Sequence, residues 1–221
     1  MRPAGQHCSA LRLLCVHEGI ADGVIEMLQG AAKELKAGDP SDVASDVGPV
    51  IDVEAHDNIQ RHITRLKSEA KVLVAPAEQA QAATHSIANL IAPHAFEVGR
   101  IADVSAEIFG PVLQVVRWTG EPGDVIAQIN ALGYGLTLGI QTRIDSRVQA
   151  LAHAAHVGNV YINRNMIGAV VGVQPFGGEG LSGTGPRAGG PHYLYRFCAE
   201  QTVTVNTAAA GGNAALLAAQ H

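Results

Sequence analysis

A cysteine in a short polar loop is the residue of this sequence best placed to carry out chemistry. Cys8 lies in the run GQHCSA, which covers residues 5–10 and precedes an apolar stretch. Cysteine reacts as its thiolate, so a reactive cysteine needs a polar, partly exposed position in which its pKa can fall. His7 is adjacent, but neighbouring side chains in an extended segment point to opposite faces. Position alone leaves two interpretations open, a catalytic nucleophile and a buried structural thiol.

A carboxylate and an aromatic ring precede another apolar run. Residues 105–112 read SAEIFGPV and contain Glu107 and Phe109. Such a pair could hold the two hydroxyls of a ribose and flank a flat ring. The alternative interpretation is an ordinary junction between a loop and a strand.

Ten of the 25 glycines lie between Gly158 and Gly190. Glycines gather where the backbone turns sharply or approaches another group closely. Residues 178–183, GEGLSG, match the letters of the G-x-G-x-x-G dinucleotide fingerprint, but PFG rather than a strand precedes them and Pro186 interrupts the helix that should follow. We therefore reject the fingerprint and favour a loop whose backbone N–H groups bind an anion, with a long surface loop as the alternative.

The ten histidines do not have the spacing of a metal site. His153 and His156 share a helix face at positions i and i+3, but no third ligand accompanies them. The run HEG at residues 17–19 does not continue into the zinc-binding pattern H-E-x-x-H. We predict no metal site.

The composition excludes several classes of protein. The formal net charge is −5 and 16% of the residues are charged, with no basic stripe of the kind that nucleic-acid-binding proteins carry. No apolar run reaches the length of about 18 residues that a transmembrane helix needs, and the first ten residues lack the apolar core of a signal peptide. Three widely spaced cysteines indicate neither a disulfide framework nor a zinc knuckle, and we interpret Cys15 and Cys198 as structural. We therefore expect a cytoplasmic protein without a nucleic-acid partner.

The pattern of apolar residues predicts alternating strands and helices, which must position the three candidate segments. We expect strands at residues 11–17, 71–75, 91–98, 111–118, 136–141, 159–163 and 198–205. We expect helices at residues 19–36, 54–69, 124–132 and 145–156, the last capped by Asp145 and ended by Gly158. Residues 76–86 are expected to form a surface loop. The alternation between residues 112 and 163 favours an α/β fold with a parallel sheet and right-handed crossovers.

The candidate segments occur in the order that is typical of the aldehyde dehydrogenase superfamily. GQHCSA is followed about a hundred residues later by EIFGPV, and NVYIN is followed by PFGGEGLSGTG. Over residues 5–205 the chain resembles this superfamily. The runs CSALR, NRNMIGAVVGVQPF and GLSGTGP more closely resemble the L-glutamate γ-semialdehyde (Δ1-pyrroline-5-carboxylate) dehydrogenase domain of bacterial proline utilisation A.

The resemblance implies a fold and a division of the chain. The fold is an aldehyde dehydrogenase catalytic domain of α/β class, with an open, mostly parallel sheet and flanking helices. The catalytic domain is expected at residues 1–197, an oligomerisation strand at residues 198–205 and a tail of small residues at 206–221. Such a strand implies a homo-oligomer or pairing with the N-terminal half of the enzyme.

The resemblance also implies a reaction and the residues that perform it. A cysteine nucleophile attacks the aldehyde carbon to form a thiohemiacetal, hydride passes to NAD⁺, and water releases glutamate from the resulting thioester. The implied residues are Cys8 as nucleophile, Glu107 and Phe109 as the contacts to NAD, and Ser9, Gly168, Ala169 and Phe176 as the contacts to the substrate.

Two departures from the family pattern affect these expectations. The residue before the nucleophile is usually Arg or Lys in this branch, and here it is His7, which is only partly charged near neutral pH. The family's N-terminal half is expected to lie outside this chain, and with it the NAD-binding domain, the oxyanion-hole asparagine and the glutamate that activates water.

We therefore expect a partial enzyme with little or no NAD-dependent turnover alone. The alternatives are a non-catalytic remnant that serves as an assembly module, and a dehydrogenase of another semialdehyde such as succinate semialdehyde.

Overall fold

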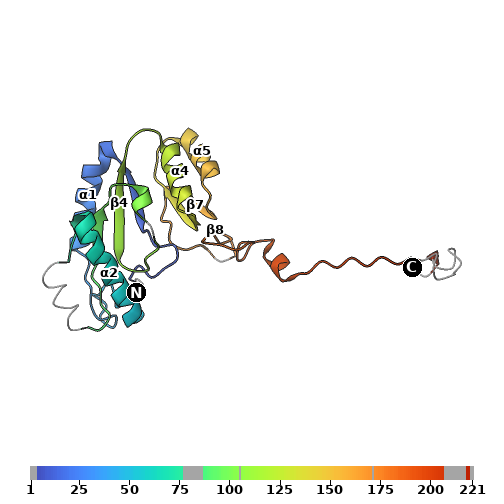
Figure 1. Ribbon diagram of the computed structural model, residues 1–221, viewed down its shortest axis with the longest axis horizontal. Coiled ribbons are helices and arrows are strands. Elements are labelled where there is room, and N and C mark those ends of the chain that lie inside the picture. The colour runs from blue at the N-terminus through green and yellow to red at the C-terminus, as the bar shows by residue number, and fades with distance from the viewer. Residues whose placement is uncertain (1–3, 77–86, 105, 171, 207–217, 220–221) are drawn as a thin grey trace.

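The computed structural model describes residues 4–76, 87–104, 106–170, 172–206 and 218–219 of the 221-residue chain. Figure 1 shows helices packed around strands, and beyond them the last described residues run outward as an extended segment. The predicted loop at residues 76–86 lies almost entirely outside the described residues.

Four strands form the main sheet. Their order is β1 (Leu13–His17), β4 (Val112–Trp118), β3 (His94–Glu97) and β2 (Lys71–Val74). β1 and β3 both pair with β4 in parallel, whereas β2 pairs with β3 in the antiparallel direction. β4 is central, and its largely apolar sequence VLQVVRW suits a strand with helices on both faces of its sheet.

Helices cover both faces of this sheet. α1 (Glu18–Lys33) and α2 (Val53–Glu69) each present an apolar stripe. Val115 of β4 is fully buried in one hydrophobic cluster with residues of α1. Val116 points to the opposite face, since side chains alternate along a strand, and packs in a second cluster with residues of α2. Asp52 begins α2 by accepting a hydrogen bond from the Ala55 amide at 2.8 Å.

The residues after β4 form a second parallel pair of strands. α4 (Pro122–Ala131) leads to β6 (Thr137–Ile140), and α5 (Asp145–Ala154) connects β6 to β7 (Asn159–Ile162). β6 and β7 pair in parallel, as a strand–helix–strand crossover requires. Figure 1 shows α4, α5 and β7 grouped together beside β4.

Shorter elements complete the described part of the chain. β5 (Tyr134–Gly135) pairs with β8 (Glu179–Gly180) in the antiparallel direction, and single 3₁₀ turns lie at Ile101–Asp103 and Tyr193–Phe197. Residues 198–206 are extended and exposed, and they pair with no strand among the described residues. Pairing of residues 198–205 with another subunit stays a prediction.

The predicted α/β class and the mostly parallel strand arrangement are confirmed, with three corrections of detail. The parallel strands belong to two sheets rather than one, because β1 and β6 do not pair. Asp145 was expected to cap α5, but it is the first helical residue, and Ile144 occupies the cap position without a side-chain hydrogen bond. Gly158 does not end α5 directly, because the helix stops at Ala154.

Gly158 has a different role, which a substitution can test. A Cβ atom at Gly158 would overlap the carbonyl oxygen of Gly177, so the two backbones approach as closely as they do only because no side chain intervenes. We expect Gly158→Ala to lower the free energy of unfolding by about 1–3 kcal/mol, measured by urea denaturation. Gly23→Ala in α1 is the control, since a Cβ there meets no atom within 4 Å and should stabilise the helix by about 0.5–1 kcal/mol. Equal effects at the two positions would contradict this interpretation.

Candidate functional site

The loop before β1 exposes one residue and buries the next. It turns at Gly5, where φ is 71°, and is closed by a hydrogen bond from the Ala10 amide to the His7 carbonyl at 3.0 Å. Cys8 is exposed, whereas Ser9 is fully buried. The loop thus presents the candidate nucleophile on a backbone that is anchored immediately beside it.

The strongest anchor of this loop is the guanidinium group of Arg12. It donates to the carbonyl oxygens of His7 and Ala10, both at 3.0 Å, and to that of Ile108 at 3.1 Å. The first two acceptors belong to the cysteine loop and the third to a segment 96 residues further along the chain. A planar fork of donors suits this task, which a single ammonium group could not perform in the same geometry.

Arg12 also contacts the two predicted cofactor-binding residues. Its Nη1 atom lies 3.5 Å from Oε1 of Glu107, and its Cζ atom lies 4.3 Å from the centre of the Phe109 ring. Burial lowers the pKa of Arg12 from its ordinary value, and the nearby Glu107 and Cys8 act in the opposite direction. Arginine stays charged after such a shift, so a positive charge lies beside the Glu107 carboxylate and acts on the candidate nucleophile.

Close backbone contact fixes the same two segments against each other. A Cβ atom at Gly5 would overlap the carbonyl oxygen of Gly110, and one at Gly110 would lie 2.7 Å from a methyl group of Ile59. The first glycine of GQHCSA and the glycine of EIFGPV are therefore both needed for packing. In addition, the Gln6 side chain accepts a hydrogen bond from the Ile51 amide at 2.9 Å.

Ser9 and Gly168 are also brought together, although 159 residues separate them. The Gly168 amide donates to Oγ of Ser9 at 2.9 Å, and the Gly168 carbonyl accepts from the Tyr161 hydroxyl at 3.0 Å. His7 Nδ1 lies 3.1 Å from the same Ser9 hydroxyl. Ser9 and Gly168, both predicted to contact the substrate, are thus hydrogen-bonded to each other in this structure.

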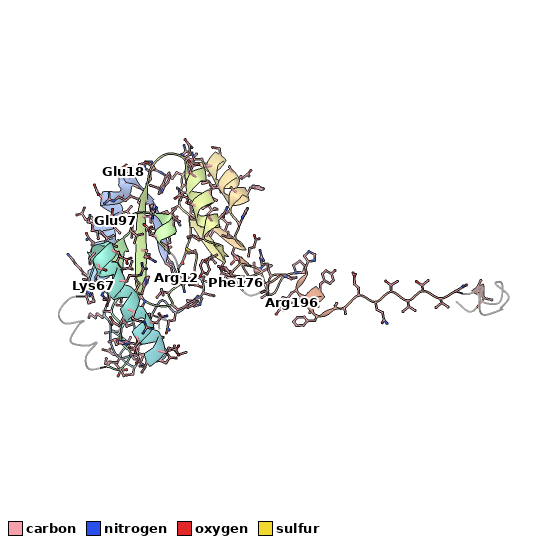
Figure 2. All side chains as sticks on the ribbon, in the orientation of Figure 1. Arg12, Glu18, Lys67, Glu97, Phe176 and Arg196 are labelled. Atoms are coloured by element: carbon pink, nitrogen blue, oxygen red, sulfur yellow. The ribbon has the colours of Figure 1, made fainter. Side chains whose placement is uncertain are left out.

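The other two predicted substrate contacts are placed differently. Ala169 follows Gly168 and is half-buried. Phe176 is half-buried in the glycine-rich segment, where its backbone exchanges two hydrogen bonds with Ala188 at 3.0 and 2.8 Å. In Figure 2, Phe176 and Arg12 lie toward the same end of the molecule, from which the extended segment departs.

A cavity of about 750 Å³ begins at the cysteine loop and continues along β1. Cys8, Arg12 and Glu107 line it, together with Ala106. Ser9, Gly168 and Phe176 are not among the residues that line it. The structure therefore unites the candidate nucleophile with Glu107 at one cavity and places the predicted substrate contacts outside its lining.

The sequence analysis assigned no role to Arg12, although it contained a signal. Arg12 is the single charged residue in the apolar run LRLLCVH. A charged side chain in such a run is rarely buried without partners, and here its side chain is 15% exposed. The residue type indicated a buried anchor, but its partners at residues 107–109 could not be read from the spacing.

The remaining motifs have structural roles in the described residues. Glu179 and Gly180 of the GEGLSG run form β8, and the Ser182 hydroxyl accepts a hydrogen bond from the Gly135 amide at 3.1 Å. No group of three or more His, Cys, Asp or Glu residues within the described ranges could hold a metal ion. No helix in those ranges is long and apolar enough to cross a membrane.

Sequence comparison places these observations in a family. The profile of the Aldehyde dehydrogenase family matches residues 1–203. The chain belongs to the aldehyde dehydrogenase family. The match contains the two segments that meet at Arg12 and the Gly168 segment that bonds to Ser9.

Individual aldehyde dehydrogenase relatives are much longer than this chain. The bifunctional protein PutA of Escherichia coli K12 is 52% identical over 201 residues, which are 90% of this chain and 15% of PutA. A crystal structure of a Bradyrhizobium japonicum proline utilization A mutant is 57% identical, with a TM-score of 0.82 over 95% of this chain and 21% of the other. A 1-pyrroline-5-carboxylate dehydrogenase from Thermus with bound NAD is 33% identical, with a TM-score of 0.77 over 88% of this chain and 37% of the other.

The exposure of the three cysteines predicts which of them reacts. Burial raises the pKa of the Cys15 thiol to about 11, so about 0.1% of it is thiolate at pH 8. Cys198, expected to be structural, is exposed. We expect iodoacetamide at pH 8 to alkylate Cys8 and Cys198 and to spare Cys15, as measured by peptide mass spectrometry after timed quenching. Labelling of Cys15 should rise as the pH approaches 11, and equal labelling of Cys8 and Cys15 at pH 8 would refute the assignment.

The fork geometry of Arg12 predicts that lysine cannot replace it. We expect Arg12→Lys to lower the free energy of unfolding by about 2–4 kcal/mol, because three partly buried carbonyl groups lose their donors. Arg100→Lys is the matched control, since the Arg100 side chain is 77% exposed and pairs with Asp103 at the surface, and it should cost less than about 1 kcal/mol. Denaturant titration of both variants measures the difference, and similar costs would show that Arg12 is not an anchor.

Proposed function

We propose that this chain carries the nucleophile-bearing part of an L-glutamate γ-semialdehyde dehydrogenase that acts in proline catabolism. The observation that carries the proposal is the exposed Cys8 at the mouth of a cavity, on a loop that Arg12 fixes to the segment bearing Glu107. Membership of the aldehyde dehydrogenase family and 52% identity to PutA of E. coli support it. Because the chain spans 15% of that protein, the activity of the whole enzyme belongs to the proposal.

In the proposed reaction, Cys8 supplies the nucleophile. Its thiolate sulfur adds to the aldehyde carbon and forms a C–S bond, and the carbonyl oxygen becomes the alkoxide of a thiohemiacetal. The backbone N–H of Cys8 donates a hydrogen bond to that oxygen, a contribution of roughly 3 kcal/mol to the transition state. Loss of a hydride gives a thioester, and water cleaves the C–S bond to release glutamate and the thiol.

Glu107 and Phe109 are the residues proposed to hold NAD, which, when bound, supplies the two-electron acceptor for this oxidation. The Glu107 carboxylate fits such a group, because its side chain is 32% exposed and its oxygens can accept hydrogen bonds from ribose hydroxyls beside Arg12, whose Nη1 lies 3.5 Å from Oε1. The Phe109 ring is 41% exposed, with Arg12 against one face. An aromatic surface of this kind suits a flat heterocyclic ring.

The substrate's carboxylate is proposed to bind at Ser9, Gly168 and Ala169, with Phe176 packing on its aliphatic stem. Gly168 has a φ of 72°, and a Cβ atom there would meet no atom within 4 Å, so no side chain covers its amide. That amide already donates to Ser9, so an incoming carboxylate must share or replace this hydrogen bond. His7 adds its ring 3.1 Å from Ser9, which gives the histidine a contact to the serine hydroxyl where the family usually has a fixed charge.

Two other functions are supported by specific features. Residues 198–206 are extended and exposed, and Val203 and Val205 are more than 70% exposed, which favours an assembly module that pairs with a longer partner. A different semialdehyde as substrate is the second, because the proposed contacts at Ser9, Gly168 and Ala169 recognise a carboxylate, which other semialdehydes also carry.

A hybrid enzyme tests the proposal. We replace the aligned 201 residues of E. coli PutA with this chain and measure NADH formation from pyrroline-5-carboxylate. We expect turnover that Cys8→Ala lowers at least about a thousandfold, because the covalent step is lost, whereas Cys198→Ala leaves it unchanged. The chain alone should give little or no NADH, because the described residues contain no dinucleotide-binding domain.

The outcomes separate the candidate functions. An inactive hybrid together with binding of the free chain to intact PutA favours the assembly module. Equal turnover of succinate semialdehyde, which lacks the amine, contradicts the assigned substrate. Robust turnover by the chain alone overturns the expectation of a partial enzyme.

A further inference from the structure

The hydroxyl group of Ser9 joins the cysteine loop to the segment that contains Gly168. Ser9 is fully buried, and its Oγ accepts a hydrogen bond from the Gly168 amide at 2.9 Å. The Nδ1 atom of His7 lies 3.1 Å from the same Oγ. Among the described residues these are the two contacts of the hydroxyl, so a change at the His7 ring reaches Gly168 through one oxygen atom.

The backbone of His7 is anchored, whereas its ring is half-buried and can change its charge. The His7 carbonyl accepts hydrogen bonds from Arg12 and from the Ala10 amide, both at 3.0 Å. The ring takes part in no ion pair within the described ranges. The charged or titratable neighbours in its own loop and in the EIFGPV segment are Arg12, Cys8 and Glu107.

On the other side of the hydroxyl, Gly168 is held independently of Ser9. The Tyr161 hydroxyl donates to the Gly168 carbonyl at 3.0 Å, and Tyr161 is 5% exposed. The guanidinium group of Arg164 covers the Tyr161 ring, with its Cζ atom 4.6 Å from the ring centre. Tyr161 and Arg164 are the titratable and charged neighbours on this side. The amide of Gly168 is therefore the group at which a change in the Ser9 hydroxyl is felt.

The charge of His7 decides which way the Ser9 hydroxyl can point. A serine hydroxyl has one proton to donate and two lone pairs that accept. Neutral imidazole has one nitrogen without a proton, and with Nδ1 in that state it accepts the Ser9 proton. Imidazolium has a proton on both nitrogens, so Nδ1 must donate to Oγ. Protonation of His7 thus reverses this hydrogen bond and releases the Ser9 proton.

The two directions differ in what they offer to a carboxylate, which in its ionised form only accepts hydrogen bonds. When a carboxylate takes the Gly168 amide, the buried Oγ of Ser9 loses its donor, and a buried oxygen without a donor is costly. Imidazolium at His7 supplies a replacement, charge-assisted donor and leaves the Ser9 proton for the carboxylate. Neutral His7 that accepts at Nδ1 competes for that proton.

We propose that His7 is a positioning residue that acts through the Ser9 hydroxyl, so that a carboxylate binds at Ser9 and Gly168 together with one proton taken up by His7. The inference rests on the carboxylate site of the proposed function and adds the linked proton to it. Histidine side chains change charge between about pH 5 and 8. Because the bound state favours imidazolium, the affinity for the carboxylate is highest at low pH in this range and falls as the pH rises.

Nuclear magnetic resonance of the full chain tests the reversed hydrogen bond without a ligand. The amide proton of Gly168 reports on the oxygen that accepts from it. We expect its resonance to move between pH 6 and pH 8 in the unaltered chain and to stay fixed in His7→Arg, because arginine keeps its charge. His153→Arg is the matched control, since His153 is exposed on α5 and its Nδ1 lies 2.8 Å from the Gln149 carbonyl. This variant should keep the full movement.

Titration of the same chain with L-glutamate, the proposed product, measures the linked proton. From pH 6 to pH 8 we expect Kd to rise at least about fivefold in the unaltered chain and less than about twofold in His7→Arg. His153→Arg should behave as the unaltered chain does. Every variant is titrated with the same ligand, so a pH effect on L-glutamate itself appears in all of them and cancels in the comparison.

A further variant, Ser9→Ala, separates action through the hydroxyl from direct attraction by the imidazolium. It keeps His7 and removes the oxygen through which His7 is proposed to act. The change in Kd between pH 6 and pH 8 should therefore fall below about twofold. A fivefold change that survives in Ser9→Ala would show that His7 attracts the carboxylate directly, and it would overturn the positioning role.

The outcomes distinguish this inference from the proposed function on which it rests. If L-glutamate moves the Gly168 amide resonance in no variant at either pH, the proposed carboxylate site fails, and the inference fails with it. If L-glutamate binds equally well at pH 6 and pH 8, the inference is overturned and the carboxylate site stands. A Gly168 resonance that does not respond to pH in the free, unaltered chain also overturns the inference and leaves the site untouched.

Discussion

Desolvation of the Arg12 guanidinium is the constraint on which the geometry of the site depends. A buried charge is costly unless its donors are all engaged, and here three carbonyl groups, a carboxylate and an aromatic face surround it. The carbonyl acceptors come from the segment before β1 and the segment before β4. Satisfying the donors of this one guanidinium group therefore requires that the cysteine loop and the EIFGPV segment meet. The position of Cys8 relative to Glu107 follows from that requirement.

Periodicity predicted most elements, because the helices and strands that pack on the main sheet have strong apolar patterns. α2 and β4 lie within two residues of their predicted bounds. Sequence patterns could not show that β1 and β6 belong to different sheets. Strand pairing joins segments that are distant in the sequence, and the apolar pattern of one segment does not identify its partner. The prediction that Asp145 caps α5 was wrong, because aspartate is equally favourable in the first turn of a helix.

The family motifs pointed to Cys8 and Glu107 as candidate residues. The contact between their segments runs through Arg12, whose partners could not be predicted from the spacing of residues in the sequence.

The glycines of the site act mainly through backbone packing. Side chains at Gly5, Gly158 or Gly178 would each overlap a neighbouring carbonyl oxygen. These three glycines therefore mark places where one backbone crosses another closely. Gly168 differs from them, because a Cβ there would meet no atom within 4 Å while its φ is 72°. Its lack of a side chain serves the conformation and the access of its amide.

The hydrogen bond between Ser9 and Gly168 has a mechanical consequence. Ser9 is covalently next to Cys8, so this hydrogen bond ties the backbone beside the candidate nucleophile to a segment 159 residues away. Any group that captures the Gly168 amide takes away one of the restraints on the backbone beside the sulfur. Binding of the far end of a ligand is then coupled to the alignment of its reacting end. The free energy gained by binding the Gly168 amide is offset by the loss of a restraint on the backbone beside Cys8.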